Sequence, residues 1–340
     1  MTFAPVMIPT LNRYKHFRDC VESLAACTHA DKTELVIGLD YPPAEKYVEG
    51  WKQIKEYLPT ITGFGKVTIF EHDKNLGASG NSIFLRKYVF DNYDACIFTE
   101  DDNVFSPCFL DYMDKCLEKY KNDEDVVCIN GCLEPDMQRL LSDEMNRDSS
   151  VIKVIGNMSA YGMGIWKSKE QKLKESFPVD FRKYVFSSRR RIIKLLQCPA
   201  KLNHIYFWIK DNPKLNRICD FTRNAWYVLH HQMNILPVVS LVRNNGFDGT
   251  GENCGYSNEE MHSWQNMEIS KETTYDIIDL MNKNDINRVS KKLFGCATKG
   301  EIKAIRPVII RHLIFGYNIS EKIERIMLNI KNRMKRLLKR

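Results

Sequence analysis

The chain has 340 residues, of which 44% are hydrophobic and 27% are charged, so it can bury a large core and is not expected to be disordered. Its eleven cysteines include no CxxC pair, which argues against zinc, and no apolar run approaches the ~20 residues of a membrane span. No signal-peptide pattern opens the sequence, so we expect a cytoplasmic protein with reduced, mostly buried thiols.

The first 130 residues alternate between strand and helix patterns. Apolar runs predict strands over 6–8, 34–39, 67–70, 95–99 and 126–129. Apolar residues spaced three and four apart predict helices over 14–26, 79–91 and 108–120. This order is typical of a mostly parallel α/β sheet with crossover helices.

Polar residues follow the predicted strands. In open parallel sheets, ligands bind beyond the carboxyl ends of the strands, so these residues are candidates for a binding site. They are Thr10, Asn12 and Arg13 after the first strand, Asp40 after the second, Glu71, His72 and Asn75 after the third, and Glu100, Asp101 and Asp102 after the fourth.

The stretch CIFTEDDN (96–103) leads from a predicted buried strand directly into three carboxylates. Like charges ~4 Å apart repel by about 4 kcal/mol at an effective dielectric of 20, unless a cation lies among them. Mg²⁺ or Mn²⁺ takes one or two carboxylates and completes its shell with phosphate oxygens, so we expect the acids to hold a metal that holds a diphosphate. The alternative is a solvated turn in which Asp102 or Ser106 caps the next helix and Pro107 starts it.

Four stretches carry a resemblance to a known family: PVMIPTLNRYKHFRDCVESL, ELVIGLDYPP, HDKNLGASGNSIFLRKYVF and CIFTEDDNVFSPCFLDYM. Together they resemble nucleotide-sugar glycosyltransferases of the GT-A fold, particularly the inverting family 2. The acids match the Asp-x-Asp metal motif of that fold in the form Glu-Asp-Asp, which also looks like the N-acetylglucosaminyltransferases that start complex N-glycans. With YGMGIW, the likeness extends to about residue 255.

The resemblance implies a GT-A domain, Rossmann-like with a mostly parallel sheet and flanking helices, followed by a C-terminal helical appendage. It implies that Thr10, Asn12 and Arg13 lie against the nucleotide and that Asp40 accepts a hydrogen bond from uracil. It further implies that Asp102 binds Mn²⁺ or Mg²⁺, while Glu100 and Asp101 contact sugar and ribose hydroxyls.

Several of these residues also have plain structural interpretations. Asp40 can form a turn before Pro42 and Pro43, and Arg13 can simply open the first helix. Asn75 belongs to a turn that leads into a helix. The turn and the start of this helix either line the nucleotide pocket or form a plain capped helix that binds no ligand.

From about residue 150 the pattern is less regular, and we expect a second lobe. The predicted division is 1–130 for the nucleotide-sugar half, 131–257 for the acceptor half, and 258–340 for a helical C-terminal region. The glycine-rich loop 244–256 predicts a segment that closes over the donor, and His262 is a further candidate metal ligand.

An inverting transfer needs a carboxylate base for the acceptor hydroxyl. Asp220 lies 17 residues before Pro237, a spacing that resembles the catalytic Asp and the Pro-x-x-Ser strand of the N-acetylglucosaminyltransferases. Cys219 and Phe221 flank it where that family has Trp-Asp-Asp-Trp, and a helix cap is the alternative role. The rival bases are Asp180, Asp248 and Glu252.

The last twenty residues contain eight Lys or Arg and two Glu, so they hold nearly all of the net charge of +7. Apolar residues at 319, 323, 326, 330, 334 and 337 predict an amphipathic helix with one basic face. Such a helix can lie on an anionic membrane, pack on the protein's own core, or pair with a partner helix. Nucleic acid is not an expected partner, because no aromatic residues are interleaved with the basic ones.

We therefore predict a metal-dependent inverting glycosyltransferase that moves a sugar from a nucleotide-sugar donor, a UDP-sugar, to a glycan or lipid-linked acceptor. Its expected place is the inner face of a bacterial plasma membrane, in cell-surface polysaccharide or lipopolysaccharide synthesis. One alternative is a sugar-phosphate nucleotidyltransferase, although IPTLNR lacks the glycine usual in the first loop of such enzymes. The other is a non-catalytic membrane-associated scaffold with a nucleotide-sugar fold.

Overall fold

The computed structural model describes residues 3–142, 150–156, 158–196, 218–251, 262–264, 266–294 and 299–337. The chain forms two compact units, one of Met1–Glu175 with Gln232–Val289 and the other of Ser176–His231 with Ser290–Arg340. This division follows contacts, whereas the predicted boundaries at 130 and 257 follow expected roles and stay predictions.

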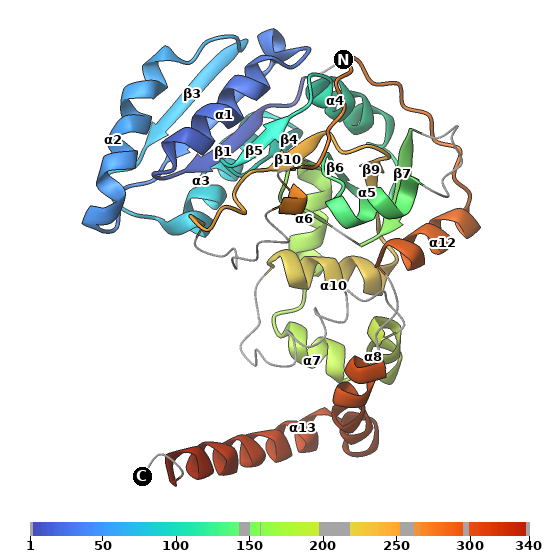
Figure 1. The fold of residues 1–340 in the computed structure, drawn as a ribbon. Coiled ribbons are helices and arrows are strands. Elements are labelled where there is room, and N and C mark those ends of the chain that lie inside the picture. The colour runs from blue at the N-terminus through green and yellow to red at the C-terminus, as the bar shows by residue number, and fades with distance from the viewer. Residues whose placement is uncertain are drawn as a thin grey trace. The chain divides into compact units, whose positions relative to one another are not determined.

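The first unit is built on one mixed sheet. Among the described residues, its eight strands lie in the order β3-β2-β1-β4-β8-β6-β9-β7 (Figure 1). The strands are β1 (Val6–Thr10), β2 (Glu34–Leu39), β3 (Lys66–Glu71), β4 (Ala95–Phe98), β6 (Val126–Asn130), β7 (Val151–Ile155), β8 (Met163–Trp166) and β9 (Met233–Pro237). Neighbouring strands from β3 to β4 run parallel, as do β6 and β9, while β8 and β7 are antiparallel to their neighbours. The predicted mostly parallel sheet is confirmed.

Helices flank this sheet. They are α1 (Tyr14–Ala25), α2 (Val48–Tyr57), α3 (Gly77–Asn92), α4 (Phe109–Lys119), α5 (Pro135–Ser142) and α6 (Lys167–Ser176), and α12 (Lys283–Phe294) follows later in the chain. Short 3₁₀ turns occur at Ala30–Lys32, Glu45–Tyr47 and Leu58–Thr60. The helices predicted over 14–26, 79–91 and 108–120 are confirmed to within two residues at each end.

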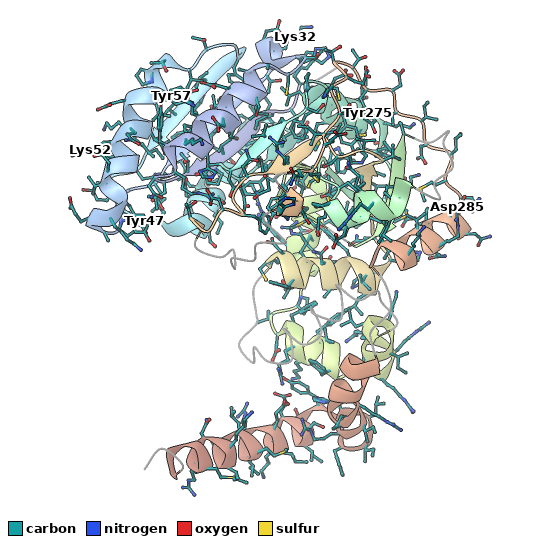
Figure 2. All side chains as sticks on the ribbon, viewed as in Figure 1. Lys32, Tyr47, Lys52, Tyr57, Tyr275 and Asp285 are labelled. Carbon is teal, nitrogen blue, oxygen red and sulfur yellow. The ribbon has the colours of Figure 1, made fainter. Side chains whose placement is uncertain are left out.

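The helices hold the sheet through their apolar faces. In α1, the buried residues are Phe17, Cys20, Val21 and Leu24, which are spaced three and four apart as predicted. Tyr57 of α2 meets Phe17 edge-on, with 6.1 Å between ring centroids, and Tyr275 packs on the fully buried Tyr112 of α4 at 5.0 Å. Figure 2 labels Tyr57 and Tyr275 among the side chains.

Two sequence-based expectations about local structure are wrong. The residues after the acids do not cap a helix: Asn103–Phe105 form β5, which pairs antiparallel with β10 (Val242–Asn244), and α4 starts only at Phe109 with Cys108 as its N-cap residue. The second lobe expected from about residue 150 does not start there either, because the second unit begins at Ser176. YGMGIW contributes β8, which pairs with both β4 and β6 and therefore belongs to the first sheet.

The second unit is helical. It contains α7 (Phe181–Phe186), α8 (Arg189–Leu196), α10 (Asp220–His230) and α13 (Lys299–Leu337). The α13 segment changes direction at Gly316, whose φ of 70° and ψ of 176° are not helical. The buried Arg182 of α7 forms ion pairs with Glu321 at 2.9 Å and Glu324 at 3.3 Å, and so fixes the part of α13 that follows Gly316.

Candidate functional site

The three acids occupy the turn between β4 and β5, at the carboxyl end of β4. Asp101 is 8% exposed and Asp102 is 5% exposed, while Glu100 is half-buried. Because β1 runs parallel to β4 as its neighbour, the residues that follow β1 reach the same edge of the sheet. The sequence-based placement of the acids beside Thr10 and Arg13 agrees with this arrangement.

Arg13 lies between the two buried carboxylates. Its Nη2 donates to Asp101 Oδ1 and to Asp102 Oδ2, each at 2.7 Å, and Thr10 Oγ1 donates to Asp101 Oδ2 at 2.7 Å. Burial raises the pKa of Asp101, and the Arg13 charge offsets this only in part. Burial lowers the pKa of Arg13, but the two carboxylates reverse the shift and hold it above its usual value. The two acids repel each other unless a cation lies between them. In the structure, the guanidinium of Arg13 supplies this positive charge.

Asp102 also meets the segment that follows β10. Asn244 Nδ2 donates to Asp102 Oδ1 at 2.7 Å, and Asn245 N donates to the Asp102 carbonyl at 2.8 Å. A Cβ atom added at Gly246 would lie 2.0 Å from Asp102 Oδ2, closer than real Cβ atoms come to other atoms. Any residue other than glycine here would require the Asp102 side chain to shift.

Asn244 and Gly246 were predicted only as members of a mobile loop. Their role depends on the pairing of β5 with β10, which brings Asn244 to within 2.9 Å of Asn103, 141 positions away in the chain. In the sequence, only the glycine content of the loop pointed to this role. A high glycine content indicates a flexible loop just as well as it indicates close packing.

The next part of this segment contacts α1. Asp248 Oδ2 lies 3.0 Å from His16 Nε2. Burial raises the pKa of Asp248, but hydrogen bonds from Thr250 and the nearby charges of His16 and Arg13 outweigh burial and hold it below its usual value. A carboxylate with a lowered pKa accepts a proton poorly, so Asp248 is a weak candidate base. Its rival Glu252 lies outside the described residues.

Asp40 and Asn75 meet at the ends of β2 and β3. Asp40 Oδ1 accepts from Tyr41 N at 2.9 Å and from Leu76 N at 2.8 Å, and Asp40 Oδ2 accepts from Asn75 Nδ2 at 3.2 Å. The buried Asp40 therefore joins the end of β2 to the start of α3, a larger role than a local turn. A carboxylate oxygen has two acceptor positions, so Oδ2 keeps one for a ligand.

An aromatic pair lies beside Asp40 that was missed at the sequence level. Tyr41 is 44% exposed, and its ring is 6.0 Å from that of Trp51, over which Lys55 lies. An exposed aromatic face suits stacking with a flat ring such as a nucleobase. The sequence could have indicated this aromatic residue, because Tyr41 directly follows the predicted site residue Asp40.

The remaining predicted residues are less closely associated. Asn12 is half-buried, and its carbonyl lies so close to α2 that a Cβ at Gly50 would be 1.8 Å away. Asp220 is the exposed first residue of α10 in the second unit, whose placement relative to the first unit is not determined. Asp180, in the same unit, caps α7 by accepting from Lys183 N at 2.8 Å. His262 Nδ1 lies 3.0 Å from Asn266 Nδ2.

The number of carboxylates at the acids can be compared with what a divalent metal ion requires. Within the described ranges, no group of three or more His, Cys, Asp or Glu side chains is arranged to hold a metal. Mg²⁺ needs only one or two carboxylates when substrate phosphates complete its shell. The buried neighbours Asp101 and Asp102 meet that requirement, and an ion on Asp102 would compete with Arg13 for Oδ2. The expectation that Asp102 holds a metal ion therefore stays a prediction.

Neither protein-family models nor curated protein sequences match the chain. Solved structures do match. Residues 1–349 of S. aureus TarS are 14% identical, over 70% of this chain and 57% of that one, with a TM-score of 0.37. The mannosyltransferase PcManGT from Pyrobaculum calidifontis, in complex with GDP-Man and Mn²⁺, is 14% identical over 67% of this chain and 70% of that one, with a TM-score of 0.36.

A putative glucose-1-phosphate thymidylyltransferase from Bacillus anthracis is also similar, at 12% identity over 79% of this chain and 98% of that one, with a TM-score of 0.36. In a longer TarS structure, the match spans only 30% of that chain. At these TM-scores the similarity decides nothing about activity or substrate, so any functional conclusion depends on the geometry around Asp101 and Asp102.

Proposed function

We propose that the chain is a metal-dependent glycosyltransferase that moves a sugar from a UDP-sugar to a hydroxyl of a glycan or lipid-linked acceptor, with inversion at the anomeric carbon. One observation carries the proposal: two buried, adjacent carboxylates at the carboxyl end of β4, hydrogen-bonded to Thr10, Arg13 and Asn244. In open α/β sheets, nucleotides bind at this edge.

The nucleoside would occupy the side of the site formed by Asp40. The open acceptor position on Asp40 Oδ2 suits the N–H of a uracil ring, and the exposed Tyr41 offers a face for stacking. Asn75 holds Asp40 in place from the start of α3. Glu100 and Asp101 would then meet the hydroxyls of the ribose and the sugar.

The diphosphate would lie between Asp102 and Arg13. Asp102, with Asp101 beside it, would hold Mn²⁺ or Mg²⁺, and such an ion neutralises the charge that develops on the leaving diphosphate. Arg13 would turn from the carboxylates to the phosphate oxygens, which its planar guanidinium can bind in pairs. Residues 244–246 would have to move, because Gly246 lies against Asp102 Oδ2.

The acceptor hydroxyl needs a base as its oxygen bonds to the anomeric carbon and the bond to the diphosphate breaks. We assign this role to Asp220. The support is its spacing of 17 residues from Pro237, which resembles that of the catalytic Asp in the N-acetylglucosaminyltransferases, and Asp220 is exposed at the start of α10. The Asp220 carboxylate would take the proton, and attack opposite the leaving group would invert the configuration.

Calorimetry with UDP-sugars and Mn²⁺ tests the donor site. Asp102→Ala should abolish metal-dependent donor binding, while Asp91→Ala, which removes a surface carboxylate that pairs with Lys87 at 2.6 Å, should leave it unchanged. Intact binding by the Asp102 variant would rule out the proposed site. Asp220→Asn should keep donor binding and lose transfer, and pyrophosphate release in place of sugar transfer would favour a nucleotidyltransferase.

We further propose that α13 places the enzyme on an anionic membrane. Six apolar residues after Gly316 are more than half exposed: Ile319, Ile326, Met327, Leu328, Ile330 and Met334. Lys322, Arg325, Lys331 and Arg333 lie on the same stretch, and each basic residue near an anionic surface contributes about 1 kcal/mol. None of the described helices has the length and apolar character needed to cross a bilayer.

Vesicle sedimentation tests this placement with the full chain and with a chain truncated after Tyr317. The full chain should sediment with vesicles that contain phosphatidylserine and not with neutral ones, and the truncated chain should stay in solution. Equal binding by both chains would show that α13 is not the membrane contact.

A further inference from the structure

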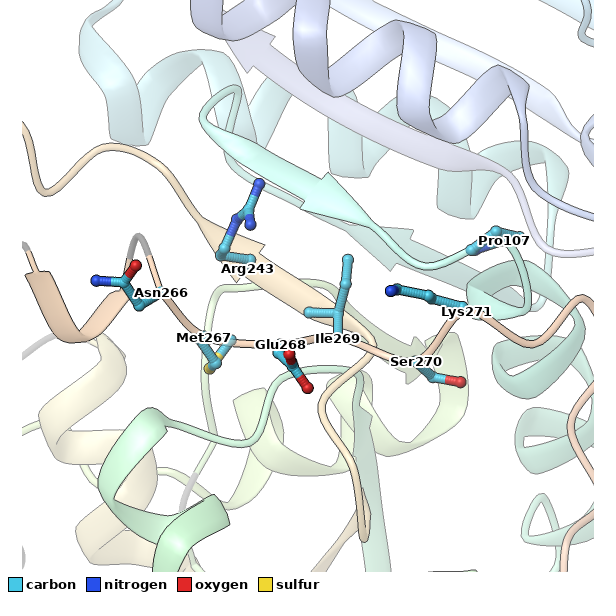
Figure 3. Close-up of a pocket in the computed structure, with 8 residues that line it drawn as sticks. All are labelled: Pro107, Arg243, Asn266, Met267, Glu268, Ile269, Ser270 and Lys271. Carbon is cyan, nitrogen blue, oxygen red and sulfur yellow. The ribbon is translucent and has the colours of Figure 1, made fainter.

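A pocket of about 350 Å³ lies beside β10 in the first unit. Its lining consists of Pro107, Arg243 and the segment 266–271 (Figure 3). None of these residues belongs to the donor site described above, and the pocket has no role in the proposed transfer.

The pocket and the acids lie on different faces of the β5–β10 ribbon. Arg243 and Asn244 are consecutive in β10, opposite Val104 and Asn103 of β5. Consecutive side chains in a strand point to opposite faces. Because the Asn244 side chain bonds to Asp102, the Arg243 side chain is directed away from the carboxylates.

Two cations from different parts of the chain contribute to the lining. Arg243 comes from β10 and Lys271 from the later segment, and Figure 3 shows the Lys271 side chain directed toward Ile269, with Arg243 on the other side of it. Within the described part of the chain, no carboxylate forms an ion pair with either, and Arg243 Nε donates to the neutral Asn245 Oδ1 at 3.2 Å. Glu268 is the one acid of the lining, so the lining carries a net positive charge.

The wall formed by 266–271 is anchored through its backbone. Ser270 N donates to Ser240 O at 3.1 Å, and Met267 N donates to Trp264 O at 3.2 Å. Gln138 Nε2 donates to the Glu268 carbonyl at 3.0 Å. The pocket therefore exists before any ligand arrives, as small-molecule sites generally do.

We propose that this pocket binds an anionic group, a phosphate or a carboxylate, carried by a small molecule. The Arg243 guanidinium can donate two parallel hydrogen bonds to such a group, and the Lys271 ammonium adds a second charge from the opposite wall. Pro107 and Ile269 offer apolar contact to the rest of the molecule. The inference goes beyond the proposed function, because this binding requires neither metal nor nucleotide.

Calorimetry on the full chain without metal or nucleotide tests the proposal, with inorganic phosphate and glucuronate as separate probes. Arg243→Gln and Lys271→Gln should each weaken binding about tenfold, because each removes hydrogen bonds to a charged group. Arg243→Lys should retain part of the affinity. Glu268→Gln should strengthen binding by removing the opposing charge, and Lys52→Gln, on the exposed face of α2, should change nothing.

The two probes separate the two sources of negative charge. Phosphate binding that depends on Arg243 and Lys271 assigns the pocket to phosphate groups, and glucuronate binding with the same dependence assigns it to acidic sugars. Absence of binding by both probes, or binding that neither Gln variant weakens, would overturn the proposal. UDP with Mn²⁺ should not displace either probe, so failure of the donor site and failure of this pocket remain distinguishable.

Discussion

The ion pairs of Arg13 lead to a quantitative prediction for Arg13→Gln. The guanidinium donates at 2.7 Å to both Asp101 and Asp102, which are almost fully buried. The substitution leaves two adjacent carboxylates in a site of low polarity with no cation between them. The cost should therefore resemble that of breaking a buried ion pair and not that of losing a surface contact.

Removing one partner of a buried pair costs about 3–5 kcal/mol. The Arg13 side chain keeps 20% exposure, so solvent screens part of the interaction and the lower end, about 3 kcal/mol, applies. In a domain of this size, 1 kcal/mol changes Tm by about 2–4 °C, so Arg13→Gln should lower Tm by roughly 6–12 °C.

Thermal unfolding in EDTA, followed by near-UV circular dichroism, measures this loss. Arg18→Gln is the matched control, because Arg18 lies in α1, which Arg13 precedes as the N-cap residue, but is 39% exposed and pairs more weakly, at 3.5 Å with Asp19 and 3.7 Å with Glu22. Added Mn²⁺ should restore part of the stability of the Arg13 variant, since an ion can take the place of the guanidinium. Equal Tm values for the two variants would refute the reasoning that Arg13 neutralises the acids.

Three further predictions concern other parts of the chain. Gly246→Ala should weaken metal-dependent nucleotide binding in calorimetry and cost about 1–3 kcal/mol of stability, because the new Cβ would meet Asp102 Oδ2 at 2.0 Å. Burial raises the pKa of Asp114 to about 7, so the stability that its protonated form contributes should be lost as the pH rises from about 4 to about 7. Urea titrations across that range should show a flatter pH profile for Asp114→Asn, and an unchanged profile would contradict this. Arg182→Gln should destabilise the second unit by about 3 kcal/mol, which limited proteolysis of α13 would detect, because Glu321 and Glu324 lose their buried partner.

Much of the first unit was predictable from local patterns. The helix of residues 14–25 buries the residues whose spacing predicted it, and the strand at 34–39 was predicted with the observed bounds. The β8 strand was not recognised, because its four residues follow Gly162, include Gly164 and carry no clear alternation, so that only its pairing with β4 and β6 defines it. The alternative in which Asp102 or Ser106 caps α4 is wrong for the same reason, because β5 forms through its pairing with β10.

The candidate site was predictable only as a set of residues at one sheet edge. Asp40 and Asn75 could be placed near each other from parallel strand order, and their hydrogen bond agrees with that. The sequence did not indicate that Arg13 lies between the two acids, and the assignment of a metal ion to Asp102 stays a prediction. The assignment of Asp220 as base stays a prediction.

The sequence by itself determined where five strands and three helices of the first 130 residues form and which polar residues follow those strands, because hydrophobic periodicity is a local property of the chain. Only the tertiary structure decided that Arg13 lies between Asp101 and Asp102 and that Gly246 packs against Asp102. It also decided that Arg243 faces a separate pocket. The reason is physical: these contacts join segments far apart in the chain, and strand order and register, which leave no local pattern, bring them together.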